Sequence, residues 1–306
     1  MKAVYIEQYG GPDVVKYGDL PDPVAAPGEV VVDVVAASVN GADWKVRVGT
    51  YGYTKFPLGL GRDFSGVVST VGPGVDDFKI GDEVFGVCEQ GQEGAYAEKL
   101  AMKASIVAKK PAELSHINAA ALGLTGLTAA ISIEDTLKLQ RGETILIQGG
   151  AGGVASFAIQ LAKHIGARVI TTTSTANIDY VRGLGADQIV DYTTQDFTKL
   201  VSNCDAVFET VGGDVTQKSF SVVKPGGRVA CIASGPQAPP SPRSDVASLR
   251  PQVKRSRRHL EHIAELFKAG VIRAPAVKLY RLSEAVEALR VSESRHFRGK
   301  LVFQVR

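Results

Sequence analysis

A glycine-rich segment near the middle of the chain has the residue types of a phosphate-binding turn. The segment ETILIQGGAGGVASFAIQLAK, residues 143–163, runs from apolar residues through four glycines into a helix-like pattern. In a strand–turn–helix unit, such a turn lets a pyrophosphate approach the backbone, and the unpaired N–H groups at the helix N-terminus attract it. The residues predicted to contact the phosphates are Gly149, Gly150, Ala151, Gly152, Gly153 and Val154. Because the spacing is G-x-x-G-x-x-A rather than G-x-G-x-x-G, a glycine turn that binds nothing remains an alternative.

The residues after the next apolar run indicate which dinucleotide would bind. A site for NAD places an acidic residue there, which accepts from the ribose 2′-hydroxyl. This chain has Thr172, Thr173 and Ser174 instead, and hydroxyls donate to a 2′-phosphate that a carboxylate would repel. The sequence therefore favours NADP(H), with further contacts expected from Asn177 and Tyr192. The alternative is a structural role, in which these hydroxyls only cap the following helix.

The surrounding pattern predicts two kinds of domain. The first third is rich in β-branched residues separated by Gly, Pro and Asp turns, and no helical periodicity interrupts it until about Ile117. This is typical of an antiparallel β domain. From there, short apolar strands alternate with helices, which indicates a doubly wound α/β domain with a parallel sheet. The chain closes with a strand-like run, GKLVFQV.

Composition excludes several classes of protein. The 306 residues are 44% hydrophobic and 22% charged, as in ordinary globular proteins, and allow about two domains. A net charge of +3 does not point to nucleic acid or a membrane surface as the main partner. We expect no membrane-spanning run, and the N-terminus lacks the apolar core of a signal peptide, so a cytoplasmic protein is predicted. The three cysteines suit reduced, buried thiols.

Eight segments, in order, resemble the medium-chain dehydrogenase/reductases, specifically the zinc-independent quinone oxidoreductase branch. They are ASVNGADWKVRVG, GLGRDFSGVV, GVDDFKIGDEVFG, LGLTGLTA, ILIQGGAGGVASFAIQLAK, GADQIVDY, DAVFETVGG and SRHFRGKLVFQV. The resemblance implies an α/β protein with a GroES-like antiparallel β domain, residues 1–118 and 265–306, that carries the substrate. It also implies an inserted Rossmann NADP-binding domain with a doubly wound parallel sheet, residues 119–264. NADP(H) is the implied cofactor.

The same resemblance bears on zinc. Where the zinc-dependent branch has a Cys and a His, this chain has Asn40 and Arg62. Asn is a poor zinc ligand and Arg is not one. The four-cysteine structural lobe is also missing, since Cys88 stands alone in its segment. We therefore predict no metal site, and a zinc-dependent alcohol dehydrogenase is an alternative that these residues disfavour.

Without a Lewis acid, hydride transfer requires an acceptor that is already electrophilic, such as a quinone or an α,β-unsaturated carbonyl. The resemblance implies six candidate catalytic residues: Asn40, Asp43, Lys45, Tyr53, Arg62 and Asp63. Asn40 could donate to the substrate oxygen, and Lys45 or Arg62 could stabilise an enolate, with Asp43 or Asp63 holding these cations in place. Tyr51 and Tyr53 could stack on a planar acceptor. A turn role for Asn40, a structural ion-pair network for the charged residues and surface positions for the tyrosines are the alternatives.

Further cofactor contacts follow from the resemblance alone. Thr125 is expected near the nicotinamide ribose, and two pairs of residues after later strands are expected to contact the cofactor, the second of them near the nicotinamide carboxamide. These pairs are Val211 with Gly212, and Ala233 with Ser234. Arg298 and Lys300 would lie on the phosphate side, or else begin a strand that faces solvent.

A basic cluster and a proline-rich segment leave two further questions. KRSRRH, residues 254–259, is expected to be a solvated helix face, but it also allows a different function: a non-catalytic NADPH-binding protein with an RNA or protein partner. Many relatives form a homodimer through edge strands, and a homodimer is expected here. Pro236, Pro239, Pro240 and Pro242 weaken that expectation, because proline cannot donate to a sheet.

Overall fold

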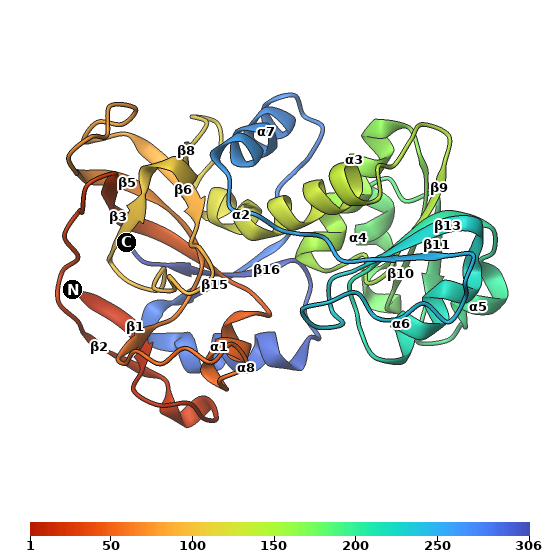
Figure 1. Cartoon of the computed structure of the whole chain (residues 1–306), viewed down its shortest axis with the longest axis horizontal. Coiled ribbons are helices and arrows are strands. Elements are labelled where there is room, and N and C mark those ends of the chain that lie inside the picture. The colour runs from red at the N-terminus through yellow and green to blue at the C-terminus, as the bar shows by residue number, and fades with distance from the viewer. The chain divides into compact units, whose positions relative to one another are not determined.

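A computed structural model describes all 306 residues and divides them into two compact units. Unit 1 contains residues 1–124, 255–268 and 274–306, and unit 2 contains residues 125–254 and 269–273. The predicted N-terminal boundary at residue 118 therefore lies six residues early. The prediction was wrong for residues 255–264, which we placed in the nucleotide-binding domain. They begin helix α7 (Arg257–Lys268), which packs against strand β8 (Val107–Lys109) of unit 1 (Figure 1).

Unit 1 is built on a seven-stranded sheet with the order β15-β16-β3-β5-β6-β8, and β7 pairs with β3 beside this path. All pairs are antiparallel except β15 with β16. The strands are β3 (Glu29–Val39), β5 (Asp63–Val71), β6 (Glu83–Val87), β7 (Lys99–Lys103), β8, β15 (Val277–Arg281) and β16 (Lys300–Gln304). The expected strand over residues 29–39 is thus present at full length, and the C-terminal strand joins it directly, Val302 opposite Ser38.

Smaller elements complete unit 1. A three-stranded sheet has the order β2-β1-β4 and contains β1 (Lys2–Ile6), β2 (Lys16–Asp19) and β4 (Leu58–Gly59). The helices are α1 (Asp43–Arg47), α7 and α8 (Ala285–Ser294), with single helical turns η1 (Pro12–Val14), η2 (Ala104–Ile106) and η6 (Leu282–Glu284). One apolar core joins strands from the start of the chain to its end, for example Val4, Phe64 and Phe303.

Unit 2 contains a parallel six-stranded sheet with the order β11-β10-β9-β12-β13-β14. Its strands are β9 (Thr144–Ile147), β10 (Arg168–Thr173), β11 (Gln188–Asp191), β12 (Cys204–Glu209), β13 (Val223–Cys231) and β14 (Ala247–Leu249). Counted from β9, this is the order 3-2-1-4-5-6 of dinucleotide-binding sheets, in which the ligand lies where the order reverses, next to the first strand. The doubly wound sheet was correctly predicted from its continuous apolar strands.

Helices cover the strands of unit 2. Helix α3 (Gly153–Ile165) packs against β9 and β10, α4 (Ile178–Gly183) against β10 and β11, and α6 (Asp214–Ser219) against β12 and β13. The remaining helical elements are α5 (Phe197–Leu200), η4 (Thr175–Asn177), η5 (Phe220–Val222) and the π-helical η3 (Ile131–Thr136). In Figure 1 these elements run from yellow-green to cyan.

Helix α2 (His116–Ala130) is the most apolar helix of the chain. It begins as the sequence indicates, with the Ser115 hydroxyl accepting from the N–H of Asn118 at 3.2 Å. Together with η3 it forms a stretch of 21 residues that has the length and hydropathy of a membrane span, contrary to the sequence prediction, but 78% of its apolar window is buried within the protein. Burial of this kind is typical of the core helix of a globular domain, because the protein itself covers the apolar side chains.

Candidate active site

The glycine turn of unit 2 is shaped by close approach. Gly149 follows β9 with a φ of +69°, which favours glycine, and its N–H donates to the Thr172 hydroxyl at 3.0 Å. A Cβ on Gly150 would lie 2.3 Å from Oγ1 of Thr171, so no other residue fits there. The tight turn assigned to Gly149 is therefore confirmed, while the turn's function is not fixed by this geometry alone.

The start of helix α3 offers a binding site for an anion. Gly152 is its N-cap and provides no side chain, and the first intrahelical bond is donated by Ser156 to the Gly152 carbonyl. The N–H groups of Gly153, Val154 and Ala155 therefore have no helical acceptor. These donors, with the partial positive charge of a 13-residue helix, fit the pyrophosphate of a dinucleotide.

The predicted cofactor residues after β12 and β13 lie beside this turn. A Cβ on Gly149 would contact Val211, and a Cβ on Gly212 would lie 3.2 Å from Cβ of Ala233. Sequence reasoning missed the residue that forms this edge, Glu209. Its fully buried carboxylate accepts from the N–H groups of Val211 and Gly212 at 2.6 and 2.7 Å, so it holds the loop in place. Its position at the end of an apolar strand was the only signal.

The hydroxyls after β10 are not equally available. Thr172 donates to Gln148 Oε1 at 2.6 Å and accepts from Gly149, so it serves the turn rather than a ligand. Ser174 accepts from the amide of Asn177 at 3.0 Å, and no side chain caps η4 or α4. The structural alternative, in which these hydroxyls cap the following helix, is therefore wrong. Tyr192 lies on the neighbouring strand end, half exposed, with its N–H bonded to the Thr173 carbonyl.

In unit 1, Asn40 is the centre of a buried polar cluster at the ends of β3, β5 and β16. Asn40 Oδ1 accepts from the Lys300 ammonium at 2.7 Å, and Nδ2 donates to Asp63 Oδ2 at 2.9 Å. Lysine only donates and a carboxylate only accepts, so these two neighbours fix the orientation of the amide. Ser38 also donates to Asp63 at 2.7 Å, and the N–H of Leu124 donates to its other oxygen at 3.0 Å.

The prediction for Lys300 needs correction. Its side chain is only 4% exposed, and its ammonium donates to the Val39 carbonyl and to Asn40, with Asp63 at 3.6 Å. It therefore does not face solvent, and two of its three N–H donors are used within the cluster. Burial lowers the pKa of this ammonium, opposed mainly by the charge of Asp63. The strand register explains the error, because it directs this residue into the unit.

Asp43 is fully buried at the start of α1. Its Oδ2 accepts from the N–H of Asn40 at 2.7 Å and from the hydroxyl of Tyr96, whereas Oδ1 has no hydrogen-bond partner. Burial raises the pKa of Asp43 to about 7, opposed by the charge of Arg62 and the Tyr96 hydroxyl. Tyr96 reaches this position because Gly61 has no side chain: a Cβ there would lie 2.2 Å from the tyrosine ring.

Arg62 is paired with a residue that the sequence analysis did not identify. Its Nε and Nη2 bind both oxygens of Glu93 at 2.8–3.0 Å, and the two side chains are 5% and 0% exposed. Burial alone would lower the pKa of Arg62, but Glu93 raises it overall. We predicted that Asp43 or Asp63 would hold this cation, and that is wrong, since Asp63 binds Asn40 and Asp43 acts on Arg62 only through its charge.

The other predicted residues have different surroundings. Tyr53 donates to Glu93 at 3.2 Å and stacks on Tyr51, so it joins the Arg62 cluster. Lys45 lies over the Trp44 ring, 5.7 Å from its centre. The remaining residues are Thr125, buried in α2, Ser234, which follows β13, and Arg298, which is exposed.

A metal does not fit the Asn40 cluster. The amide oxygen of Asn40 is bound by a cation, and Arg62 places a second positive charge where the zinc-dependent branch has a ligand. No group of three or more His, Cys, Asp or Glu side chains anywhere in the chain has the arrangement of a metal site.

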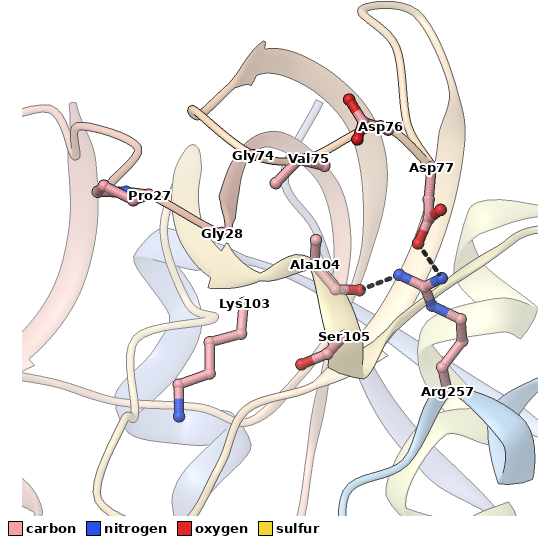
Figure 2. Close-up of a pocket in the computed structure, with 10 residues that line it drawn as sticks. All are labelled: Pro27, Gly28, Gly74, Val75, Asp76, Asp77, Lys103, Ala104, Ser105 and Arg257. Carbon is pink, nitrogen blue, oxygen red and sulfur yellow. Dashed lines mark hydrogen bonds and ion pairs between the residues drawn. The ribbon is translucent and has the colours of Figure 1, made fainter.

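A separate hollow of about 630 Å³ lies where α7 meets η2 and the turn before β6 (Figure 2). Arg257 lines one side of it, and its nitrogens donate to Asp77, the Ala104 carbonyl and the Val107 carbonyl. Arg255 donates to the Cys88 carbonyl. Two arginines of the basic cluster therefore anchor the helix to unit 1, and the solvated face that we predicted is only partly present. Fewer positive charges of this cluster are available to bind RNA.

Comparison with known proteins identifies the family of this chain. Residues 26–112 match the family described as an alcohol dehydrogenase GroES-like domain, and residues 184–303 match one described as zinc-binding dehydrogenase. An NADPH-dependent alkenal/one oxidoreductase of Arabidopsis thaliana is 35% identical over 99% of this chain and 79% of its own length. A chloroplast quinone oxidoreductase of Triphysaria versicolor is 30% identical over 99% of this chain and 98% of its own.

The chain belongs to the quinone oxidoreductase-like branch of the medium-chain dehydrogenase/reductases. The solved structure of Escherichia coli quinone oxidoreductase complexed with NADPH agrees, with a TM-score of 0.91, 27% identity and full coverage of both chains. The resemblance stated from the sequence is thereby confirmed. One matched family is described as zinc-binding, but the residues of this chain do not fit a zinc ion, because Asn40 is bound by Lys300 and Arg62 carries a positive charge.

Proposed function

We propose that this protein is an NADPH-dependent, zinc-independent oxidoreductase that reduces a quinone or an α,β-unsaturated carbonyl. The observation that carries the proposal is the Asn40 amide, held between Lys300 and Asp63 in the position of a metal ligand. A site of this kind has hydrogen-bond donors but no Lewis acid, so it suits acceptors that are already electrophilic. Relatives that carry the names quinone oxidoreductase and alkenal/one oxidoreductase support it.

The residues that hold NADP(H) are those of the carboxyl edge of the unit 2 sheet. The pyrophosphate is assigned to the glycine turn and the N–H groups of Gly153 and Val154, and the 2′-phosphate to Thr173, Ser174 and Asn177. When bound, the nicotinamide supplies the hydride. β10 itself ends without a carboxylate, and the nearest one, Asp191 opposite Thr173 at the end of β11, is occupied by hydrogen bonds from Thr175 and Thr193.

The residues of unit 1 orient the acceptor and stabilise its developing charge. Asn40 has one Nδ2 hydrogen on Asp63, and the other lies toward the Ser38 carbonyl at 3.4 Å, which is long for a hydrogen bond. That second hydrogen is the donor assigned to the substrate oxygen. The charge of the Arg62 guanidinium is balanced by Glu93, so its assigned role is to contact the bound acceptor rather than to supply net positive charge.

The test is the oxidation of NADPH by the purified protein with an ortho-quinone, a para-quinone, a linear enone and a simple ketone. NADH is run in parallel, and each assay is repeated with a chelator. We expect turnover of quinones or enones that prefers NADPH and ignores the chelator, with the ketone inert. Reduction of the ketone, or loss of activity on chelation, contradicts the proposal.

Two further features belong to this proposal. A homodimer is supported by β14, an edge strand that pairs only with β13 and leaves its outer side open for a second copy. Light scattering coupled to size exclusion tests it, and a monomeric mass refutes it. The cytoplasmic location stays a prediction, to be checked by cell fractionation.

A further inference from the structure

The segment Glu89–Gly94 contains one acidic side chain that reaches into unit 1. Glu93 lies beside Arg62 because the backbone around it is bonded to the segment before β5. The N–H groups of Gly94 and Ala95 donate to the Gly61 carbonyl at 3.0 and 3.1 Å, and the N–H of Cys88 donates to the Arg62 carbonyl at 2.9 Å. Both ends of the segment are therefore held, and the Glu93 side chain has 0% exposure.

Glu93 orders three side chains at once. Its two oxygens accept from Arg62 in a bidentate pair, and Oε1 also accepts from the Tyr53 hydroxyl at 3.2 Å. Tyr53 in turn stacks on Tyr51, with 5.9 Å between ring centres and 15° between planes. The guanidinium of Arg62 lies 5.1 Å from the centre of the Tyr51 ring. A cation and two nearly parallel rings are thus oriented by a single carboxylate.

The same carboxylate keeps Arg62 away from Asp43. Asp43 has one oxygen without a partner, and Arg62 is the cation whose charge acts on it most strongly. Without Glu93, a buried guanidinium would lack its counter-charge, and Asp43 is a carboxylate that could replace it. Removal of the Glu93 charge is therefore expected to turn Arg62 from the tyrosines.

We propose that Glu93 is a positioning residue that fixes Tyr51, Tyr53 and Arg62 as a stack of parallel planes, which a planar, quinone-like acceptor extends. This inference rests on the proposed function, because it deepens the choice of acceptor at the same site. Aromatic rings and guanidinium planes gain most from a ligand that is itself flat. A linear enone has a smaller planar group and gains little from them, so the Glu93 cluster separates the two acceptor classes.

The experiment compares the full chain with Glu93→Gln and Glu93→Asp. The matched control is Glu89→Gln, since Glu89 lies in the same segment but is exposed and pairs with Lys103 at the surface. Binding of a naphthoquinone without NADPH is followed by quenching of Trp44, the single tryptophan. KM and kcat are then measured with the naphthoquinone and with a linear enone, and circular dichroism checks that each variant is folded.

For Glu93→Gln we expect Kd and KM for the naphthoquinone to rise about tenfold, the loss of one good polar interaction, with kcat changed less than about threefold. KM for the enone and every value of Glu89→Gln should stay at the wild-type level. Glu93→Asp should recover part of the naphthoquinone affinity. Equal losses for both acceptors, or a fall in kcat with Kd unchanged, overturn the inference.

If Glu93→Gln does not fold, Tyr53→Phe removes only the hydroxyl contact and should raise Kd for the naphthoquinone and not KM for the enone. A wild-type protein that binds the naphthoquinone but reduces no acceptor would refute the proposed function, while the binding comparison would still decide the role of Glu93. A wild-type protein that does not bind it refutes this inference.

Discussion

The replacement Asp43→Asn tests the electrostatics of the buried cluster without requiring a substrate. Asparagine has the size of aspartate and no charge at any pH. Its oxygen retains the two hydrogen bonds that Asp43 accepts from the Asn40 N–H and the Tyr96 hydroxyl. The variant therefore differs from the wild type chiefly in its inability to ionise.

The expected size follows from linkage. The pKa of Asp43 rises to about 7 in the folded protein, because burial disfavours its charge more than Arg62 and Tyr96 favour it. In the unfolded chain the pKa is about 3.9. The folded protein therefore holds the proton more tightly between these values, so the contribution of Asp43 to stability is full below about pH 4 and is lost as pH rises to about 7. The loss is about 1.4 kcal/mol per pH unit, or about 4 kcal/mol in total.

Urea unfolding at pH 5, 6, 7 and 8, followed by the fluorescence of Trp44 in α1, measures this loss. We expect the unfolding free energy of Asp43→Asn to increase relative to that of the wild type as pH rises, until the variant is more stable by up to about 4 kcal/mol at pH 8. Asp33→Asn is the control: the pKa of Asp33 is lowered, against the effect of its burial, by Lys99, Ser69 and Arg306, so its loss should stay constant above pH 5. A constant difference between wild type and Asp43→Asn over this range refutes the reasoning.

Three further substitutions test other parts of the site. Lys300→Met leaves a buried carboxylate without its cation and should cost about 3–5 kcal/mol of unfolding free energy, measured in urea; a change under about 1 kcal/mol would show that the buried ammonium is not needed. Gly150→Ala brings a Cβ against Thr171, so it should weaken NADPH binding about tenfold and lower the stability by about 1–3 kcal/mol. The control Gly183→Ala, whose Cβ would meet nothing within 4 Å, should change neither quantity. Calorimetry measures the binding and thermal melting the stability. Ser174→Asp should weaken the affinity for NADPH about tenfold, because its charge repels the 2′-phosphate, and keep or raise the affinity for NADH, whose ribose 2′-hydroxyl can donate to the new carboxylate; equal losses would place the 2′-phosphate elsewhere.

Much of the fold was predictable, because its signals are local or periodic. The strand over residues 29–39 and the apolar strands of unit 2 follow from β-branched runs, and the glycine turn from its spacing. The end of unit 2 was misplaced because α7 has a strong helical pattern whichever sheet it covers. What assigns it to unit 1 is Arg257, whose partners lie about 150 to 180 residues away in the sequence.

The site was predictable as a set of residues but not as a set of pairs. Charged residues close in sequence invite the assumption that they bind one another, as we assumed for Arg62 with Asp43 or Asp63. The structure instead pairs Arg62 with Glu93, and Asn40 with Lys300, 260 residues further on. The first pairing arises because the N–H groups of Gly94 and Ala95 donate to the Gly61 carbonyl, and the second from the register of β16 against β3; no short motif encodes either.

The pairing of Asn40 with Lys300 and Asp63 has a chemical consequence. A metal ligand at the position of Asn40 would be held by the metal itself, whereas an amide has to be oriented by neighbours on both sides. Lys300 supplies a donor for its oxygen and Asp63 an acceptor for its nitrogen, and these charges approach within 3.6 Å, so the pair is close to neutral. Glu93 likewise neutralises Arg62. Among the buried charges of the Asn40 and Arg62 clusters, Asp43 is the one without an opposite partner in an ion pair, and burial accordingly raises the pKa of that carboxyl toward neutrality.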